Sequence, residues 1–137
     1  MSARTFLDTN VVVYAFDRSE PEKRGRAIEI LGAAAGSCVV STQVLQEFYV
    51  VVTRKLERPL REDAAEEAVR SLSCLHVAVL DASSVLSAIE TSRTSGISLR
   101  DALIVQAARQ SGCTRLLSED LQDGRDFGGL VVENPFA

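Results

Sequence analysis

The sequence predicts an α/β protein: a parallel sheet of four to five strands, flanked by helices on both faces, in one domain over residues 1–137. Short apolar runs alternate along the chain with longer segments of helical periodicity, and this alternation is typical of parallel sheets. The length of 137 residues suits a single domain. Hydrophobic residues make up 46% of the chain and prolines number 3, which is the composition of a folded globular protein.

Each predicted strand is a short apolar run of three to six residues. The strands are expected at residues 5–7, 38–40, 75–80, 115–117 and 130–132. The segments between them favour helices, because apolar residues recur there at intervals of three and four. The helices are expected at residues 10–16, 21–35, 42–56, 62–72, 83–95 and 98–111.

Residues typical of helix ends support these boundaries. Pro21 suits the first turn of a helix, where its missing N–H costs nothing. Ser41 is placed to cap the helix that follows it. Gly36, Gly96 and Gly112 come directly after helical segments, at the position where glycine most often ends a helix.

Composition excludes several function classes. The 15 Lys and Arg against 19 Asp and Glu give a net charge of −4, so the whole surface is not built to attract nucleic acid. The single histidine, His76, excludes zinc sites that need two, and it falls within a predicted strand. Cys38, Cys74 and Cys113 form no Cys-x-x-Cys pair, so we expect buried, reduced thiols.

The chain also has no recognisable targeting or membrane segment. Asp8 interrupts the N-terminus before an apolar stretch reaches the length of a signal peptide. No apolar run approaches the ~20 residues of a membrane-spanning helix. A soluble, cytoplasmic protein is expected.

Acidic residues recur where a parallel sheet places its functional site, beyond the carboxyl ends of the strands. Asp8 follows the first strand, and Asp120 and Asp123 follow the fourth. Each has an ordinary structural alternative: Asp8 could cap a helix, and the other two could stabilise a turn.

Two further carboxylates lie on helices. Glu47 falls at the edge of an apolar stripe, where it either reaches solvent or is partly buried with a partner. Asp101 points toward the apolar side of its helix, where an unpaired carboxylate is costly. Ser98-x-x-Asp101 also fits a capping box, and capping is compatible with a functional role.

Four carboxylates in one cleft would repel one another unless a cation neutralised them. Oxygen ligands favour Mg²⁺ or Mn²⁺ over zinc. Such an ion lowers the pKa of a bound water and polarises a phosphoryl oxygen, so phosphodiester cleavage requires neither a histidine nor a protein nucleophile.

Four motifs in order resemble the PIN-domain nucleases, and most closely the VapC-type toxins of bacterial toxin–antitoxin pairs. The motifs are TFLDTNVVVYAFD, STQVLQEFY, SLRDALIVQAA and LLSEDLQDG, and the resemblance covers essentially the whole chain. It implies a PIN-like fold and a metal-dependent endoribonuclease.

The resemblance also assigns roles to individual residues. Asp8, Glu47, Asp101 and Asp120 would be the catalytic acidic set that binds Mg²⁺ or Mn²⁺. Asp123 would be a further metal ligand. The supporting residues, which would orient the Asp8 carboxylate or a water held by the metal, are Thr9, Asn10 and Ser118, and the last of these stands where many members have Thr.

Partners follow from the same resemblance: an RNA substrate, a homodimer and a cognate antitoxin that covers the site. Arg54 and Lys55, at the end of the helix that carries Glu47, could contact RNA phosphates or simply complement the helix dipole. Arg100, directly before Asp101, could likewise contact RNA phosphates or be an ordinary solvated residue at a helix end.

Two other function classes remain open at this stage. A phosphotransfer enzyme or receiver domain would use Asp8 as a nucleophile, but it needs a lysine after a later strand, and Lys23 and Lys55 fall within helices. Asn10 also stands in place of the second Asp of the phosphatases. A non-catalytic binding module is the other alternative, and the full acidic set argues against it.

Overall fold

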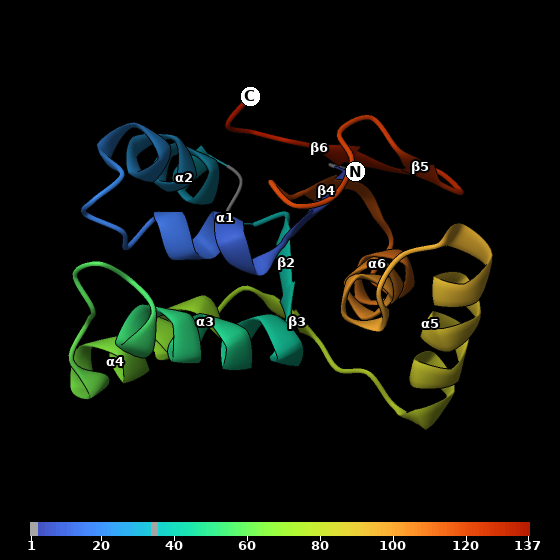
Figure 1. Cartoon of the computed structure of the whole chain (residues 1–137), viewed down its shortest axis with the longest axis horizontal. Coiled ribbons are helices and arrows are strands. Elements are labelled where there is room, and N and C mark those ends of the chain that lie inside the picture. The colour runs from blue at the N-terminus through green and yellow to red at the C-terminus, as the bar shows by residue number, and fades with distance from the viewer. Residues whose placement is uncertain (1–2, 34–35) are drawn as a thin grey trace.

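A computed structural model describes residues 3–33 and 36–137, in which a six-stranded sheet lies between two groups of helices (Figure 1). The strands run in the order β3-β2-β1-β4-β6-β5, parallel throughout except for the β5–β6 pair. They are β1 (Arg4–Leu7), β2 (Cys38–Ser41), β3 (His76–Ala78), β4 (Cys113–Leu117), β5 (Asp126–Phe127) and β6 (Leu130–Glu133). The predicted α/β class is confirmed.

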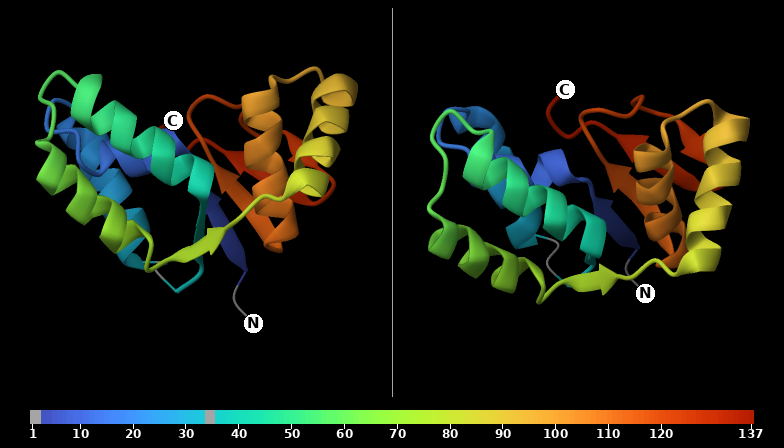
Figure 2. Two further views of the ribbon diagram at one scale, coloured as in Figure 1. Left: turned by 90° about the horizontal axis from the view of Figure 1, so that it is seen from below. Right: turned by 60° about the horizontal axis from the view of Figure 1, so that its bottom comes forward.

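The helices cover both faces of the sheet, as predicted. Figure 2 shows α1 to α4 on one side of the strands and α5 and α6 on the other. The helices are α1 (Thr9–Tyr14), α2 (Pro21–Ala33), α3 (Thr42–Arg54), α4 (Glu62–Leu72), α5 (Ala82–Ser95) and α6 (Leu99–Gln110). α3 packs on β2 from one side, and α6 packs on β2 and β4 from the other.

Several helices begin or end at residues whose capping role the sequence predicted. Ser41 accepts a hydrogen bond from the backbone N–H of Val44 at 3.3 Å, and Ser98 accepts one from Asp101 at 3.1 Å. Gly96 ends α5 with a φ of +67°, which a side chain would make strained. The predicted helix over 21–35 is observed to Ala33, and its last two residues lie outside the described residues.

The structure corrects three details of the sequence prediction. β5 was not predicted; it forms an antiparallel hairpin with β6 through Gly128 and Gly129, which have φ of +66° and +100°. β3 covers 76–78 rather than 75–80. Cys74 is exposed, whereas Cys38 and Cys113 are buried as expected, and all three are free thiols.

The core is built around the central strands. Phe6 of β1 pairs in register with Leu116 of β4, which pairs with Val132 of β6, and all three are fully buried. Phe48 from α3 and Ile104 from α6 complete the packing on the two faces. Within the described residues, no helix is both long and apolar enough to cross a membrane.

The strand order fixes where a site can form. The connection after β1 leads to β2 on one side of β1, and the chain later returns to β4 on the other side. Ligands of open α/β sheets bind outside the carboxyl ends of the strands at such a reversal. Leu7 and Leu117, the last residues of β1 and β4, are paired in register at this point.

Candidate active site

The register of β1 and β4 brings the first predicted site residues together. Asp8 follows Leu7 and Ser118 follows Leu117, so the two side chains emerge side by side. The Ser118 hydroxyl donates a 2.8 Å hydrogen bond to Asp8 Oδ2, and the backbone N–H of Asp8 donates to the Leu117 carbonyl at 3.0 Å.

The Asp8 carboxylate is completely buried, and both of its oxygens accept hydrogen bonds. Its side chain has 0% exposure. Oδ1 accepts from the backbone N–H of Thr9 at 2.7 Å and from Arg100 Nη2 at 2.9 Å. Oδ2 accepts from Ser118 and, at 3.4 Å, from Arg100 Nη1. A buried carboxylate is tolerated because hydrogen bonds and a cation replace its hydration.

Glu47 enters the site from α3, where its side chain is 31% exposed. Oε1 accepts from Thr9 Oγ1 at 2.6 Å and from Arg100 Nη2 at 2.7 Å. Burial by itself would raise the pKa of Glu47, but the bonds from Arg100 and Thr9 outweigh it, and the pKa lies below its usual value. The partly buried, partnered Glu47 is the alternative that the structure supports.

Arg100 lies at the centre of these carboxylates. It bonds Asp8 and Glu47 as described, and its Nη1 lies 3.1 Å from Asp101 Oδ1. Burial would lower the pKa of Arg100, but the neighbouring carboxylates raise it well above its usual value. One guanidinium thus faces three carboxylates, which leaves two negative charges uncompensated within this group.

Asp101 is more exposed than the helical pattern suggested. Its side chain is 26% exposed, since it stands in the first turn of α6 at the edge of the cleft and not at the middle of the apolar face. Its backbone N–H is capped by Ser98, so capping and participation in the site coexist.

Asp120 belongs to a second group of polar residues after β4. Asn10 Nδ2 donates to Asp120 Oδ2 at 3.1 Å, and Asn10 Oδ1 accepts from the backbone N–H of Glu119 at 3.1 Å. Ser118 Oγ accepts from the backbone N–H of Asp120 at 3.1 Å. Asn10 and Ser118 therefore fix this turn beside the end of β1.

Glu119 in this turn and its two partners, Tyr14 and Lys23, were not among the predicted site residues. Glu119 accepts hydrogen bonds from the Tyr14 hydroxyl and from Lys23 Nζ, both at 2.7 Å. Burial by itself would raise the pKa of Glu119, but the bonds from Lys23 and Tyr14 bring it below its usual value. These bonds join α1 and α2 to a turn 105 and 96 residues later in the chain, and no local sequence pattern predicts such long-range contacts.

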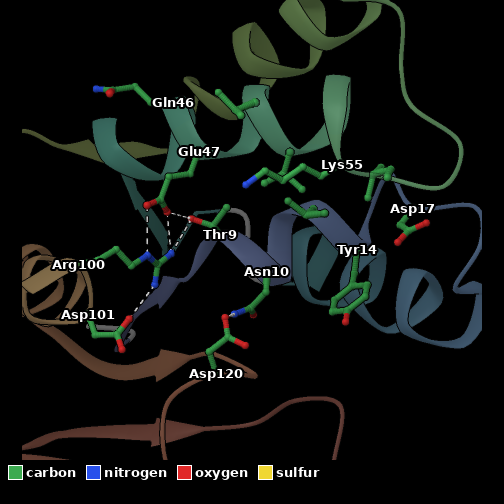
Figure 3. A pocket seen from close by; sticks show the side chains of 14 residues that line it. Thr9, Asn10, Tyr14, Asp17, Gln46, Glu47, Lys55, Arg100, Asp101 and Asp120 are labelled. Carbon is green, nitrogen blue, oxygen red and sulfur yellow. Dashed lines mark hydrogen bonds and ion pairs between the residues drawn. The ribbon is translucent and has the colours of Figure 1, made fainter. Parts of the chain in front are cut away.

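These side chains border one cleft of about 830 Å³ (Figure 3). Arg100, Glu47, Asp101 and Asp120 line it. Asp8 lies behind Arg100, bonded to its guanidinium. The remaining walls come from α1, α3 and the segments that directly follow these helices, and comprise Thr9, Asn10, Val13, Tyr14, Asp17, Gln46, Val50, Val51, Lys55 and Leu56.

Of the other predicted residues in the described part of the chain, Asp123 and Arg54 do not line this cleft, whereas Lys55 does. Asp123 Oδ1 accepts from the backbone N–H of Asn134 at 3.0 Å, which ties the loop after β4 to the residue that follows β6. The roles of Asp123 in metal binding and of the basic residues in RNA binding stay predictions.

The donor set fits a hard divalent cation. Within residues 3–33 and 36–137, no three Asp, Glu, His or Cys side chains are arranged as ready ligands of one ion. However, Asp8, Glu47 and Asp101 already face one positive group, all through oxygen atoms, and their charges exceed it. Oxygen ligands with excess negative charge are what Mg²⁺ and Mn²⁺ require.

A family model described as "PIN domain" matches residues 5–122, which is most of the chain. The chain belongs to the PIN-domain family. The matched range contains Asp8, Glu47, Asp101 and Asp120, and the fifth carboxylate predicted as a ligand, Asp123, lies just beyond it. No curated protein sequence matches this PIN domain significantly.

Solved structures with the same fold are toxins of toxin–antitoxin systems. A toxin–antitoxin complex from Klebsiella pneumoniae matches with a TM-score of 0.71 at 19% identity, over 98% of each chain. VapC20 of Mycobacterium tuberculosis, a toxin that cleaves the sarcin–ricin loop, matches with a TM-score of 0.66 at 20% identity, over 82% of this chain and 86% of its own. DNA-bound VapBC from Salmonella typhimurium matches with a TM-score of 0.69 at 17% identity, over 98% and 99%.

Proposed function

We propose that this PIN domain is an endoribonuclease that depends on Mg²⁺ or Mn²⁺ and is the toxin of a toxin–antitoxin pair. The observation that carries the proposal is the convergence of Asp8, Glu47 and Asp101 from three elements onto one positive group at the edge of a cleft. A structural ion pair needs one carboxylate per arginine, and three in one place favour a cation site.

The residues of the cleft would have two roles, holding the cation and positioning its ligands. Asp8, Glu47 and Asp101 would hold the cation, and Asp120, kept at the cleft by Asn10, would join them from the opposite side. A bound Mg²⁺ or Mn²⁺ would lower the pKa of a water and neutralise charge on the phosphoryl group under attack. Thr9 and Ser118 hold the Glu47 and Asp8 carboxylates in place.

The open cleft supports a polymeric substrate. A strand of RNA can approach the acidic group from solvent, and Lys55 at the wall would contact its phosphates. Tyr14 also lines the cleft and supplies an aromatic surface near the carboxylates.

The proposed antitoxin partner is supported by the solved structures with a similar fold. One of them is described as a toxin–antitoxin complex and others as VapBC bound to DNA. A cognate antitoxin would cover the cleft of this chain and hold it inactive. We also propose that the chain forms a homodimer, which light scattering of the purified protein would measure.

RNA cleavage by the purified protein tests the catalytic proposal. The variant of choice is Asp101→Asn, because Asp101 makes one side-chain ion pair and is partly exposed, so the fold should survive. The matched control is Asp63→Asn, which removes an exposed carboxylate on α4. Wild type and the control should cut RNA in Mg²⁺ or Mn²⁺ and stop in EDTA, while Asp101→Asn should lose activity by at least about 100-fold. Cleavage in EDTA, or undiminished cleavage by Asp101→Asn, would overturn the proposal.

A further inference from the structure

The Arg100 guanidinium occupies the point at which three site carboxylates meet. Asp8 comes from the end of β1, Glu47 from α3 and Asp101 from α6. Arg100 Nη2 lies 2.9 Å from Asp8 Oδ1 and 2.7 Å from Glu47 Oε1, and Nη1 lies 3.1 Å from Asp101 Oδ1. Figure 3 shows the side chain reaching from α6 across to Glu47, with Asp101 below it.

Arg100 also separates Asp8 from the cleft. Asp8 has no exposed side-chain surface, whereas the Arg100 side chain is 34% exposed. Both oxygens of Asp8 receive hydrogen bonds from protein groups, and Arg100 contributes to each oxygen. A solute that enters the cleft therefore meets the guanidinium before it meets Asp8.

A divalent cation and this guanidinium cannot share the same oxygens. Mg²⁺ binds its oxygen ligands at about 2.0–2.1 Å. Nη2 donates to both Asp8 Oδ1 and Glu47 Oε1, so a divalent ion held by these two carboxylates would have to displace it. The two positive charges would also repel each other in a partly buried site. Binding of one requires departure of the other.

We propose that Arg100 is a built-in counter-cation that closes the acidic cluster and exchanges with the divalent metal. This inference rests on the metal site of the proposed function. In the closed state Arg100 neutralises part of the cluster and keeps it folded. In the metal-bound state the guanidinium turns into the cleft that it already lines. The side chain alone moves, because the Arg100 backbone is held in the first turn of α6 and its carbonyl accepts from Gln43 Nε2.

The exchange predicts a specific cost in metal affinity. If only a fraction of the molecules has Arg100 turned away and can bind metal, the apparent metal affinity is the intrinsic affinity multiplied by that fraction. Arginine at this position therefore makes the protein respond to higher metal concentrations than the carboxylates alone would. Removing it should tighten metal binding, which is the opposite of what the loss of a residue that supports the ligands would do.

Calorimetric titration with MnCl₂ compares Arg100→Gln with Arg93→Gln. Arg93 is an exposed residue of α5, so its substitution removes the same charge away from the site. We expect Arg100→Gln to bind Mn²⁺ at least about ten-fold more tightly than Arg93→Gln. Equal affinity within two-fold, or weaker binding, would overturn the proposal.

The metal-free proteins supply a second readout. In EDTA, Arg100→Gln should melt at a lower temperature than Arg93→Gln, because three carboxylates lose their counter-ion. If Arg100→Gln does not fold, Arg100→Lys serves instead, since it keeps the charge but lacks the planar fork. Its Mn²⁺ affinity should also exceed that of Arg93→Gln, and unchanged affinity would count against the exchange.

Side-chain NMR of the wild type observes the exchange directly. Arg100 Nε donates to Glu47 Oε2 at 3.2 Å, and its resonance is assigned as the one missing from Arg100→Gln. Saturation with diamagnetic Mg²⁺ should move this resonance to the position of solvent-exposed arginines. A resonance that stays in place while Mg²⁺ binds would refute the exchange.

The outcomes separate this proposal from the proposed function. If Mn²⁺ binding tightens in Arg100→Gln but no RNA is cut, the exchange stands and the nuclease proposal fails. If RNA is cut in a metal-dependent manner but Mn²⁺ affinity is unchanged, the nuclease stands and the exchange fails. If neither wild type nor Arg100→Gln binds Mn²⁺, both fail.

Discussion

Substitution of Ser118 by alanine removes one oxygen atom that joins the two halves of the site. The hydroxyl has one proton to donate and two lone pairs to accept with, and all three are used. It donates to Asp8 Oδ2 at 2.8 Å and accepts from the backbone N–H groups of Asp120 and Leu121 at 3.1 and 3.3 Å. Ser118 is fully buried, so water does not readily replace the missing oxygen.

The expected loss of stability follows from these three bonds. A hydrogen bond to a charged acceptor contributes about 1.5–3 kcal/mol, and a neutral one about 0.5–1.5 kcal/mol. Asp120 is exposed, so solvent can satisfy its N–H in the variant. We therefore expect Ser118→Ala to lower the free energy of unfolding by about 2–4 kcal/mol.

Urea unfolding in EDTA measures this loss. With a slope of about 2 kcal/mol per molar urea, the midpoint should fall by about 1–2 M. The matched control is Ser84→Ala in α5, whose hydroxyl also contacts a carboxylate, Asp81, at 3.0 Å. Ser84 is buried but lies outside the cleft, and the exposed Asp81 keeps its bonds from the Ser84 N–H and the Ser83 hydroxyl in the variant, so Ser84→Ala should cost about 1 kcal/mol.

The two variants should differ more sharply in metal binding. Ser118→Ala releases both Asp8 and the turn that carries Asp120, so we expect Mn²⁺ to bind at least about ten-fold more weakly. Ser84→Ala should bind Mn²⁺ like the wild type. If Ser118→Ala unfolds within about 0.5 kcal/mol of wild type, or keeps its Mn²⁺ affinity, the hydroxyl does not have the role described here.

Three further predictions concern the fold around the site. Phe48→Ala should lower the free energy of unfolding by about 3–5 kcal/mol in urea, since Phe48 is fully buried on the helix that carries Glu47; a loss below 1 kcal/mol would contradict this packing. Iodoacetamide at pH 8 should label Cys74 alone in the folded protein, since it is the exposed thiol and burial raises the pKa of Cys113 to about 11; mass spectrometry should show one added group, and three after unfolding. Hydrogen bonds from the helix start hold the pKa of Asp81 below 3.8, so its stabilisation is present above that pH and is lost as the pH falls below it. Between pH 4 and pH 2, wild type should therefore lose more thermal stability than Asp81→Asn, and equal losses would refute this origin.

Local sequence patterns were sufficient for most of the fold. The apolar runs located the five longer strands, and the caps at Ser41, Ser98 and Gly96 placed helix ends correctly. β5 was missed because two residues are too short to show periodicity. Its signal was the Gly128–Gly129 pair between apolar residues, which favours a hairpin.

Only part of the site could be predicted, because some of its residues are placed by strand ends and others by contacts between distant segments. Asp8 and Ser118 follow strands, so the sheet rule placed them. For Glu47 the sequence left two alternatives, solvent exposure or partial burial with a partner, and the observed partner comes from a helix 53 residues later in the chain. The direction of the Arg100 side chain is decided by that tertiary arrangement, and the sequence therefore left phosphate contact and a solvated helix end as its two interpretations.

Calorimetric binding of Mn²⁺ to Asp101→Asn and Asp63→Asn is the most direct test of the acidic cluster as a metal site. The two variants make the same chemical change, one in the cleft and one on the surface of α4. If the acidic cluster is a metal site, Asp63→Asn should bind Mn²⁺ like wild type and Asp101→Asn at least about ten-fold more weakly. Equal Mn²⁺ affinities in the two folded variants would contradict it.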